Sequence, residues 1–557
     1  MSKYRNYSKE QLILHIEKLE KQLKSTKYGL YWDKEIEPEF TIEYSKKNIP
    51  ILQRIRNLTI KEKDNDLNHL IIEGDNFHVL TTLNMISNGQ GFVDVVYIDP
   101  PYNTGNKDFI YNDNFIDKDD GFRHSKWLNF MEKRLMLAKS LMKEDGTIFI
   151  SIDDNEYFNL KLLCDKIWGE HNYVGSFVRK TVSQRAMSKY FNNQHEYCLI
   201  YTNNKDLFPL IGRKKDFSGY KNPDNDPKGD WKSSDPTMRD SKNIFKIINP
   251  ITNKVDIPPA GRGWAFTEEK LQEHLELGKI VFKEKHRKNE RGFIYKTYKS
   301  ELKSHNLLLN SLEFAENAYL NQVSSKELIN IFNKKTFDYA KPLNYIKDLI
   351  SFFPNTGTPV ILDFFAGSGT TGQSVLELNQ EDGGNRQFIL VTNNENNICT
   401  DVTYPRLKTV ISGIRPDGTK YSDGISANLH YYKTDFIPNV NNRDQAKYNI
   451  VERCNELMCI VENTYNELEN NEKYSIYENN SKTKRMFLYT DFYEEKSFNE
   501  FKSKVLESSA EVVVYIFSTD NVIDETLFDK DSKVQVKPIP NKIYEIYKEI
   551  IEGIKRG

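Results

Sequence analysis

Residues 93–102, VDVVYIDPPY, join a largely apolar run to a rigid turn. The run VDVVYI predicts a strand buried on both faces, as in a parallel sheet covered by helices. Asp99, Pro100, Pro101 and Tyr102 follow at its carboxyl end, where open α/β sheets bind their ligands. Because consecutive prolines restrict the backbone, they hold the Pro100 carbonyl and the Tyr102 ring in defined positions. The stretch therefore predicts a functional site at the end of a buried strand.

This Asp-Pro-Pro-Tyr corner suits an amine that is attached to an aromatic ring. Such an amine is a poor nucleophile because its lone pair is delocalised into the ring. An active site that uses such an amine as a nucleophile needs two acceptors for the N–H groups and a flat surface for the ring. The Asp99 carboxylate and the Pro100 carbonyl can be the acceptors, and Tyr102 the surface. A tight turn without chemistry is the simpler alternative, since Pro-Pro occurs in many loops.

Strands and helices alternate on both sides of this corner. The alternation predicts an α/β fold with a parallel or mostly parallel sheet and helices on its faces. The predicted strands lie at 69–76, 93–98, 146–154, 195–203, 359–365 and 387–395. The predicted helices lie at 8–24, 79–86, 125–142, 156–169 and 370–380, with a further helix over 324–353 that begins at a Ser324/Glu327 capping box.

A second motif, DFFAGSGTT at 363–371, lies between a predicted strand and a predicted helix. Its two glycines, Gly367 and Gly369, allow backbone to approach a ligand or to take positive φ. No G-K-[ST] follows, which excludes a phosphate-binding P-loop. The spacing of Gly367, Gly369 and Gly372 does match G-x-G-x-x-G, so a nicotinamide dinucleotide stays possible. The Thr-Thr pair and Asp363 favour a smaller cofactor with an amino-acid end.

Two further strand ends carry candidate cofactor ligands. Glu395 follows the strand after the glycine turn, where a carboxylate commonly binds ribose hydroxyls. Asp75 and Asn76 lie at the end of the strand predicted at 69–76 and can bind an adenine amino group, although a plain Asp-Asn turn is the commoner explanation.

The chain divides into five predicted segments. Between 204 and 322 the alternation fails, and turn-rich stretches with Lys, Arg and Trp indicate an inserted domain. The segments are an N-terminal helical segment at 1–50, the two halves of the α/β domain at 51–203 and 323–429, the inserted domain at 204–322, and a small α/β domain at 430–557.

The inserted segment contains a locally basic, aromatic-rich stretch at 279–303. The chain as a whole has a formal charge of -2, so contact with nucleic acid must come from such local surface. A solvated charged face is the alternative. The candidate DNA-binding residues are Lys283, Lys285, Arg287, Lys288 and Arg291.

Composition excludes several classes of protein. No apolar run is long enough to cross a bilayer, and MSKYRNYSKE is not a signal peptide, so we expect a cytoplasmic protein with no membrane contact. The five cysteines are scattered without a C-x-x-C pair, which supports neither disulfides nor a metal site. Cys454 and Cys459 share a predicted helix, where we expect a structural role.

DPPY followed much later by the glycine motif resembles the beta class of DNA amino-methyltransferases, in which the catalytic motif precedes the cofactor motif. Several stretches are more specifically similar to the modification (Mod) subunit of type III restriction-modification systems. They are KYGLYWDKE (27–35), the triplet Gly74-Asp75-Asn76, DPPYNTGNKDFIYND (99–113), NPDNDPKGDW (222–231), PPAGRGW (258–264) and TNNENNIC (392–399). The similarity is looser after residue 430.

The resemblance implies a Rossmann-like domain, with permuted motif order, that depends on S-adenosyl-L-methionine and methylates adenine N6 in double-stranded DNA by base flipping. It implies a target-recognition domain at 204–322 and dimer or partner docking at 430–557. Asp99 and Pro100 would hold the adenine amino group, and Tyr102 would stack on the extruded base. The implied cofactor-binding residues are Asp75, Asn76, Lys341, Pro342, Asp363, Phe365, Ala366, Gly367, Ser368, Gly369, Thr370 and Glu395.

The resemblance also implies a homodimer and a separate restriction (Res) subunit with helicase and nuclease activity, because this sequence shows no such motifs. Cytosine-N4 methylation is the nearest alternative, and Asp rather than Ser before Pro-Pro favours adenine. A DNA-recognition subunit without methylation activity is a second alternative, against which the intact Asp99, Tyr102 and Gly367 argue. An RNA or protein amine as substrate is a third.

Overall fold

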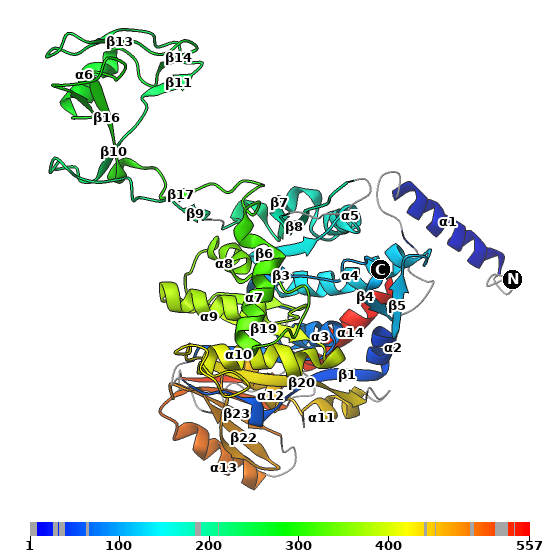
Figure 1. The fold of residues 1–557 in the computed structure, drawn as a ribbon. Coiled ribbons are helices and arrows are strands. Elements are labelled where there is room, and N and C mark those ends of the chain that lie inside the picture. The colour runs from blue at the N-terminus through cyan, green and yellow to red at the C-terminus, as the bar shows by residue number, and fades with distance from the viewer. Residues whose placement is uncertain are drawn as a thin grey trace. The chain divides into compact units, whose positions relative to one another are not determined.

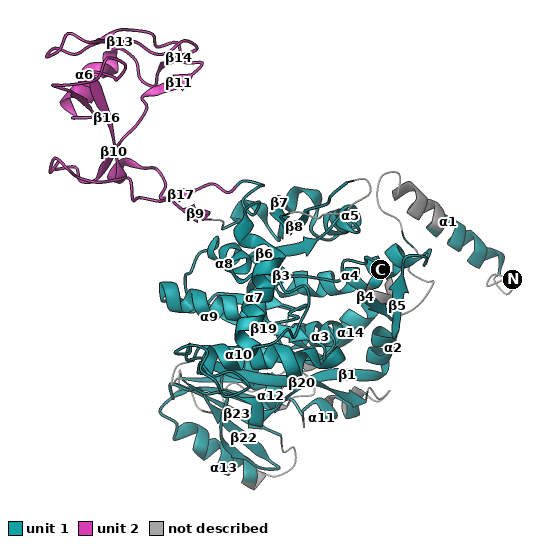
Figure 2. Cartoon of the chain, viewed as in Figure 1, with its two compact units in different colours: residues 1–210, 310–557 teal, residues 211–309 magenta. Residues whose placement is uncertain are grey.

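The chain forms two compact units, which Figure 2 shows in different colours. Unit 1 comprises residues 1–210 and 310–557, and unit 2 comprises residues 211–309. The computed structural model describes residues 8–25, 32, 39–62, 66–87, 89–183, 191–209, 211–438, 443–451, 453–490, 495–517, 528, 533–539 and 541–556. None of the helices in these ranges is long and apolar enough to cross a membrane.

A mixed sheet forms the centre of unit 1 (Figure 1). In the described part of the chain it has nine strands in the order β1-β20-β2-β19-β18-β3-β6-β8-β7. These are β1 (Asn48–Arg54), β2 (Asn68–Glu73), β3 (Val93–Ile98), β6 (Met142–Ile152), β7 (Tyr173–Lys180), β8 (His195–Thr202), β18 (Val360–Asp363), β19 (Gln387–Thr392) and β20 (Asn428–Pro438). The strands from β20 to β6 pair in parallel, while β1, β8 and β7 are antiparallel to their neighbours. The prediction of a mostly parallel α/β sheet is confirmed.

The strand order brings the two sequence motifs together. β18 pairs in parallel with β3, and Ile361 lies opposite Val95. Because parallel strands end at the same edge, Asp99 after β3 and the glycine motif after β18 leave the sheet side by side. The segment between the motifs is long, but the hydrogen bonding of the sheet makes them neighbours.

Helices cover both faces of this sheet, and every residue of β2 is therefore buried. One packed group contains α3 (Asn76–Ile86), α4 (Arg123–Leu141), α5 (Tyr157–Trp168) and α14 (Asn541–Arg556). The other contains α7 (Asn321–Phe332), α8 (Leu343–Ser351), α9 (Thr370–Asp382) and α10 (Tyr404–Ser412). The helices predicted at 79–86, 125–142, 156–169 and 370–380 are confirmed, and Gly169 ends α5 at φ 89°.

The helix predicted over 324–353 is instead two helices, α7 and α8. Ser324 lies inside α7 and donates to the Asn321 and Ala340 carbonyls, so the predicted capping box is wrong. The Glu327 carboxylate accepts from the Leu343 backbone N–H at 3.1 Å and therefore stabilises the start of α8. Local spacing could not show this contact between two helices.

The two ends of the chain contribute a helix and a second sheet to unit 1. α1 (Lys9–Ser25) confirms the predicted N-terminal helix, and the Ser8 hydroxyl accepts from the Gln11 backbone N–H at 3.2 Å. The described C-terminal strands, β21 (Asn466–Asn470), β22 (Tyr474–Glu478), β23 (Lys484–Tyr489), β24 (Glu511–Phe517) and β25 (Val534–Ile539), form one sheet with α13 (Glu495–Leu506) packed on β23. This sheet shares a compact unit with the main sheet. The boundary predicted at residue 430 falls inside β20 of the main sheet.

Cys454 and Cys459 are both buried in the core of unit 1, at the start of α12 (Asn455–Glu462) and within it. Their predicted structural role is confirmed.

Short strands and turns make up unit 2. Its core is Ile247, Trp264, Phe266, Ile280 and Phe293. Its described elements are β9 (Arg213–Lys214), β10 (Trp231–Ser233), β11 (Thr237–Arg239), β12 (Ile247–Ile248), β13 (Val255–Asp256), β14 (Arg262–Trp264), α6 (Glu269–Glu276), β15 (Ile280–Phe282), β16 (Phe293–Tyr298) and β17 (Asn306–Leu307). β9 pairs with β17, so the first and last strands of the unit are neighbours. The predicted inserted segment 204–322 extends past this unit at both ends.

Candidate functional site

A cavity of about 970 Å³ lies where β2, β3, β18 and β19 end. The loops that follow all four strands line it, together with Lys341 from the segment before α8. Thirteen of the residues expected from the sequence line this cavity: Asp75, Asn76, Asp99, Pro100, Pro101, Lys341, Asp363, Phe365, Ala366, Gly367, Ser368, Thr370 and Glu395. Three other expected residues do not line the cavity, although each is next to a lining residue in the chain: Tyr102, Pro342 and Gly369.

The corner after β3, which lines the cavity, contains a buried carboxylate oxygen. The Trp127 indole N–H donates to the Pro101 carbonyl at 2.7 Å, which fixes the turn. Asp99 Oδ2 lies 2.5 Å from the Lys341 ammonium nitrogen. Asp99 Oδ1 is buried and accepts no hydrogen bond from the described residues. A buried acceptor without a partner is costly, so this atom is suited to a donor on a bound molecule.

Burial raises the pKa of Asp99, and the nearby Lys341 ammonium opposes that rise. The Tyr102 hydroxyl donates to Glu196 Oε2 at 3.2 Å, and the Lys341 nitrogen lies 5.1 Å from the centre of the Tyr102 ring. Lys341 therefore contacts both Asp99 and Tyr102, in addition to lining the cavity. Neither Lys341's link to Asp99 nor the participation of Glu196 was foreseen from the sequence.

The turn after β18 is built on glycine. Gly367 and Gly369 have φ of 48° and 78°, and a Cβ on Gly369 would lie 3.2 Å from the Thr403 side chain. Asp363 holds the turn, because its carboxylate accepts from the Thr371 hydroxyl at 2.5 Å and from the Phe365 backbone N–H at 3.0 Å. The turn can therefore present backbone to a ligand at close range.

The buried Asp363 carboxyl is expected to make the stability of the protein depend on pH. Burial raises its pKa to about 7, so the folded protein binds a proton that the unfolded chain has released above pH 4. The contribution of this group to stability is therefore complete at low pH and is lost as the pH rises from about 4 through about 7. Asp363→Asn removes this loss, which is on the order of a few kcal/mol.

We expect the melting temperature of Asp363→Asn, relative to the natural protein, to increase between pH 5 and pH 8 in thermal unfolding without ligand. Asp206→Asn, at an exposed position of the same unit, is the control and should show no such increase. A constant difference for Asp363→Asn across this range would contradict a neutral Asp363.

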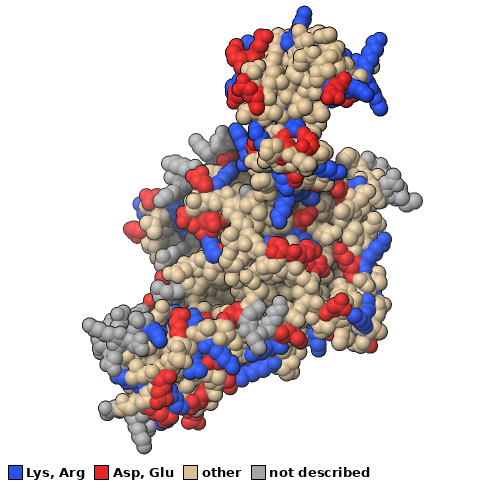
Figure 3. Space-filling model, turned by 90° about the vertical axis from the view of Figure 1, so that its left-hand side faces the viewer, with Lys and Arg blue, Asp and Glu red and all other residues tan. Residues whose placement is uncertain are grey.

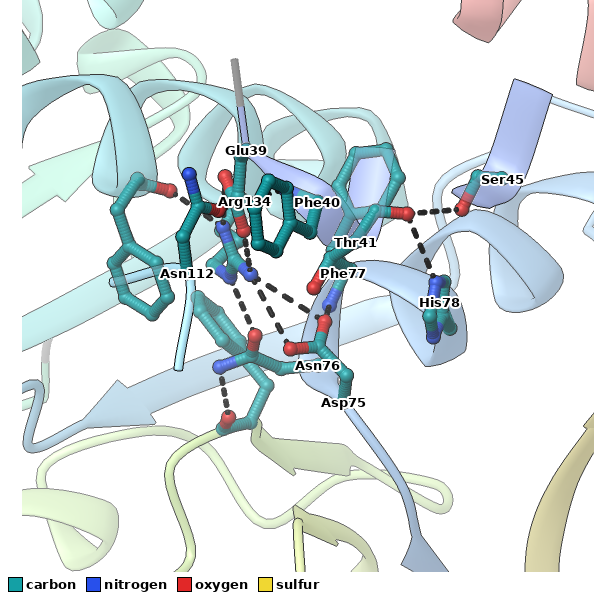
Figure 4. Close-up of polar contacts among 12 residues, drawn as sticks. Glu39, Phe40, Thr41, Ser45, Asp75, Asn76, Phe77, His78, Asn112 and Arg134 are labelled. Carbon is teal, nitrogen blue, oxygen red and sulfur yellow. Dashed lines mark hydrogen bonds and ion pairs between the residues drawn. The ribbon is translucent and has the colours of Figure 1, made fainter. Parts of the chain in front are cut away.

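At the other end of the cavity, Arg134 of α4 joins three lining residues (Figure 4). Its buried guanidinium lies 2.6 Å from Glu39, 3.4 Å from Asp75 and 2.5 Å from the Asn76 side-chain oxygen. Burial alone would lower the pKa of Arg134, but Glu39 and Asp75 raise it. Asp75 also caps α3 by accepting from the Phe77 backbone N–H at 2.7 Å. Arg134 thus orders this wall of the cavity.

Several lining residues were not among the site residues expected from the sequence. The hairpin of β4 (Asn106–Tyr111) and β5 (Asn114–Asp117) contributes part of the wall, and the Asn112 side chain accepts from the Phe40 backbone N–H at 2.8 Å. Glu39 and Arg134 were also missed. Arg134 does carry a signal, because it lies one turn from Met131 and Ala138 on the buried face of α4.

The five basic candidates lie on and around the turn between β15 and β16 of unit 2. Lys283 pairs with Glu290, and Arg291 pairs with Asp235 at 2.8 Å, so these two cations are internally neutralised. Lys285, Arg287 and Lys288 are exposed. Figure 3 shows Lys and Arg side chains projecting from unit 2, with acidic side chains close by. Three of the five candidates are therefore available to a ligand.

Among the described residues, no group of three or more His, Cys, Asp or Glu side chains is placed to hold a metal ion.

Comparisons with known proteins agree on one family. A family model described as DNA methylase matches residues 93–403. The StyLTI Mod subunit, a type III restriction-modification enzyme of Salmonella typhimurium, is 33% identical over 61% of this chain and 55% of its own length. The EcoP15I Mod subunit of Escherichia coli is 32% identical over 69% of this chain and 67% of its own. The type II methyltransferase M.KpnI of Klebsiella pneumoniae is 33% identical over 65% of this chain and 87% of its own length. The match thus spans little more than half of the StyLTI subunit.

Proposed function

The chain belongs to the DNA methylase family, and we propose that it methylates adenine N6 in double-stranded DNA, with S-adenosyl-L-methionine as donor. One observation carries the proposal: the Asp-Pro-Pro corner at 99–101 and the glycine turn at 363–371, which are far apart in the chain, line the same cavity. Transfer between two bound molecules requires such a shared space, because the reacting atoms must meet in line.

The residues around the cavity fit this cofactor. Asp75 and Asn76 are suited to its adenine and the exposed Glu395 to its ribose. The positive-φ glycines let the backbone approach its methionine end. The remaining residues of the glycine turn, together with Lys341 and Pro342, complete this part of the binding site: Asp363, Phe365, Ala366, Ser368 and Thr370. When bound, the cofactor supplies an electrophilic methyl group on a sulfonium, which needs no metal.

The corner after β3 performs the substrate side of the reaction. Asp99 Oδ1 and the Pro100 carbonyl accept the two N–H groups of an extruded adenine, which orients the N6 lone pair towards the methyl group. As the methyl transfers, positive charge develops on N6, and the Asp99 carboxylate stabilises it without itself acting as a full base. The proton leaves N6 afterwards. Tyr102 provides the ring surface against which the base stacks.

Cytosine-N4 methylation is the second candidate function, because the family name covers both N6 and N4 methyltransferases. Asp99 before the two prolines favours adenine. The intact Asp99, Tyr102 and Gly367 argue against a DNA-recognition subunit without activity, and Asp99 and Gly367 line one cavity.

We further propose that the chain is the modification and specificity subunit of a type III restriction-modification system in the cytoplasm. Two of the relatives above are named as type III Mod subunits. The proposed partners are a second copy of the chain and a restriction (Res) subunit with helicase and nuclease activity. Unit 2 reads the DNA sequence, with the exposed Lys285, Arg287 and Lys288 contacting phosphates. The C-terminal region from residue 430 serves docking.

Modification-sensitive sequencing of DNA from cells with and without the protein tests the proposal. N6-methyladenine at one short sequence, present only with the intact gene, is the expected result. N4-methylcytosine at such a site would select the second candidate. Unmodified DNA, despite expressed and folded protein, would refute methylation altogether.

An exchange of unit 2 tests where specificity lies. Replacing residues 211–309 by the matching unit of a relative cuts the chain next to the paired strands β9 and β17 and leaves the main sheet unchanged. We expect the hybrid to methylate the relative's sequence at a rate within about tenfold of the parent, since the chemistry resides in unit 1. Exchange of the C-terminal sheet, residues 466–539, is the control and should preserve the original site. An active hybrid with an unchanged site would place specificity elsewhere.

A further inference from the structure

A buried charge cluster connects the antiparallel edge of the sheet to the corner after β3. Glu196 of β8 stands at its centre. Its Oε1 accepts from Arg179 Nε at 2.8 Å and lies 3.7 Å from the Lys341 nitrogen, while its Oε2 accepts from the Tyr102 hydroxyl at 3.2 Å. Lys341 in turn contacts Asp99 at 2.5 Å. A single carboxylate is thus linked both to Asp99, which lines the cavity, and to Tyr102, the proposed stacking ring.

Glu196 is held rigidly from behind. Arg179 is fully buried and donates to the Tyr319 carbonyl at 2.5 Å and to the Asn321 side-chain oxygen at 2.7 Å. Burial alone would raise the pKa of Glu196, but Arg179 and Lys341 lower it below its usual value. A charge that is buried, paired and hydrogen-bonded on both oxygens has one favourable geometry.

We propose that Glu196 is a positioning residue for methyl transfer: it sets the Tyr102 ring through the tyrosine hydroxyl and aims the Asp99 carboxylate through Lys341. This inference rests on the proposed function of the cavity and names what orients its catalytic groups. Without it, Lys341 would have Asp99 as its sole anionic partner among the described residues, and the Tyr102 hydroxyl would lose its hydrogen bond to the Glu196 carboxylate. Errors of about 1 Å in such groups reduce rates by about 100-fold.

Glu196→Gln is the main test, because glutamine keeps the shape of the side chain and removes its charge. We expect kcat for methylation of unmodified plasmid DNA to fall about 10- to 100-fold, with the affinity for S-adenosylmethionine within about twofold of the natural protein. Glu462→Gln is a matched control. Glu462 is also buried, accepts from the Tyr515 hydroxyl at 2.5 Å and pairs with Lys484 and Lys537, but it lies in α12, outside the cavity lining. We expect Glu462→Gln to lower the stability of the protein without lowering kcat.

Tyr102→Phe separates positioning from folding, since it removes one hydroxyl and is expected to lower kcat about 3- to 10-fold. If Glu196 acts through Tyr102, Glu196→Gln must lower kcat by a smaller factor in the Tyr102→Phe variant than in the natural protein. Additive losses, a Glu196→Gln rate equal to that of Glu462→Gln, or a loss of cofactor affinity in place of rate would each overturn the inference. An inactive natural protein would instead refute the proposed function, so the two failures are distinguishable.

Discussion

Replacing Asp99 by alanine is expected to lower the rate of methyl transfer by at least about 10³-fold while cofactor and DNA binding persist. The substitution removes the buried oxygen Oδ1 and the negative charge that, in the proposed mechanism, stabilises the positive charge developing on N6. Asp99→Asn should lose about 100-fold. It retains one acceptor oxygen, but its amide N–H₂ must face either Lys341 or the base amine, which are both donors.

Asp94→Ala is the matched control for this experiment. Asp94 lies on the same strand as the corner, pairs with Lys143 at 2.7 Å and accepts from the Val360 backbone N–H at 2.8 Å. It does not line the cavity. Single-turnover methylation with labelled cofactor measures the rates, and filter binding measures DNA affinity. A rate for Asp99→Ala within about threefold of the natural protein would remove Asp99 from the mechanism.

Arg134→Ala should destabilise unit 1 by about 3–5 kcal/mol, because it leaves the buried Glu39 without its cationic partner. The substitution also releases Asp75 and Asn76, which line the cavity and are proposed to bind the cofactor. Arg134→Lys keeps the charge, but a compact ammonium cannot replace a planar guanidinium that serves three partners and stacks 3.7 Å from the Phe130 ring. We therefore expect a smaller loss of stability with at least about tenfold weaker cofactor binding.

Urea unfolding and calorimetric titration of S-adenosylmethionine separate these two effects. Arg386→Ala is the control. Arg386 is also buried, but among the carboxylates of the described chain it pairs only with the exposed Asp382, and neither residue lines the cavity. It should leave cofactor affinity unchanged. If Arg134→Lys bound the cofactor as tightly as the natural protein, Arg134 would have a structural role only.

The strands that carry the site were predictable because a strand buried on both faces is a nearly continuous apolar run. β2, β3, β18 and β19 are such strands. β20 escaped prediction because NLHYYKTDFIP mixes polar and aromatic residues without a clear period. β7, YVGSFVRK, is only partly buried at the sheet edge and escaped for the same reason.

The motif residues were predictable because they follow strand ends directly in the chain. The charges that hold them were not. Glu39 reaches Arg134 across 95 residues, and Lys341 reaches Asp99 across 242. Such pairs are created by tertiary packing, and a single sequence contains no local trace of the partner. Glu196 offered a weak signal, since an acidic residue within the apolar strand HEYCLIYT must have a buried partner.

The pairing of β9 with β17 has an evolutionary consequence. Because Arg213 lies opposite Leu307, the unit between them leaves and re-enters the rest of the chain at a single point. If unit 2 reads the DNA sequence as proposed, genetic recombination with crossovers at that point would exchange the reading unit in one event and leave unit 1 unchanged. A lineage that carries the gene would then acquire a new methylation pattern without passing through inactive intermediates.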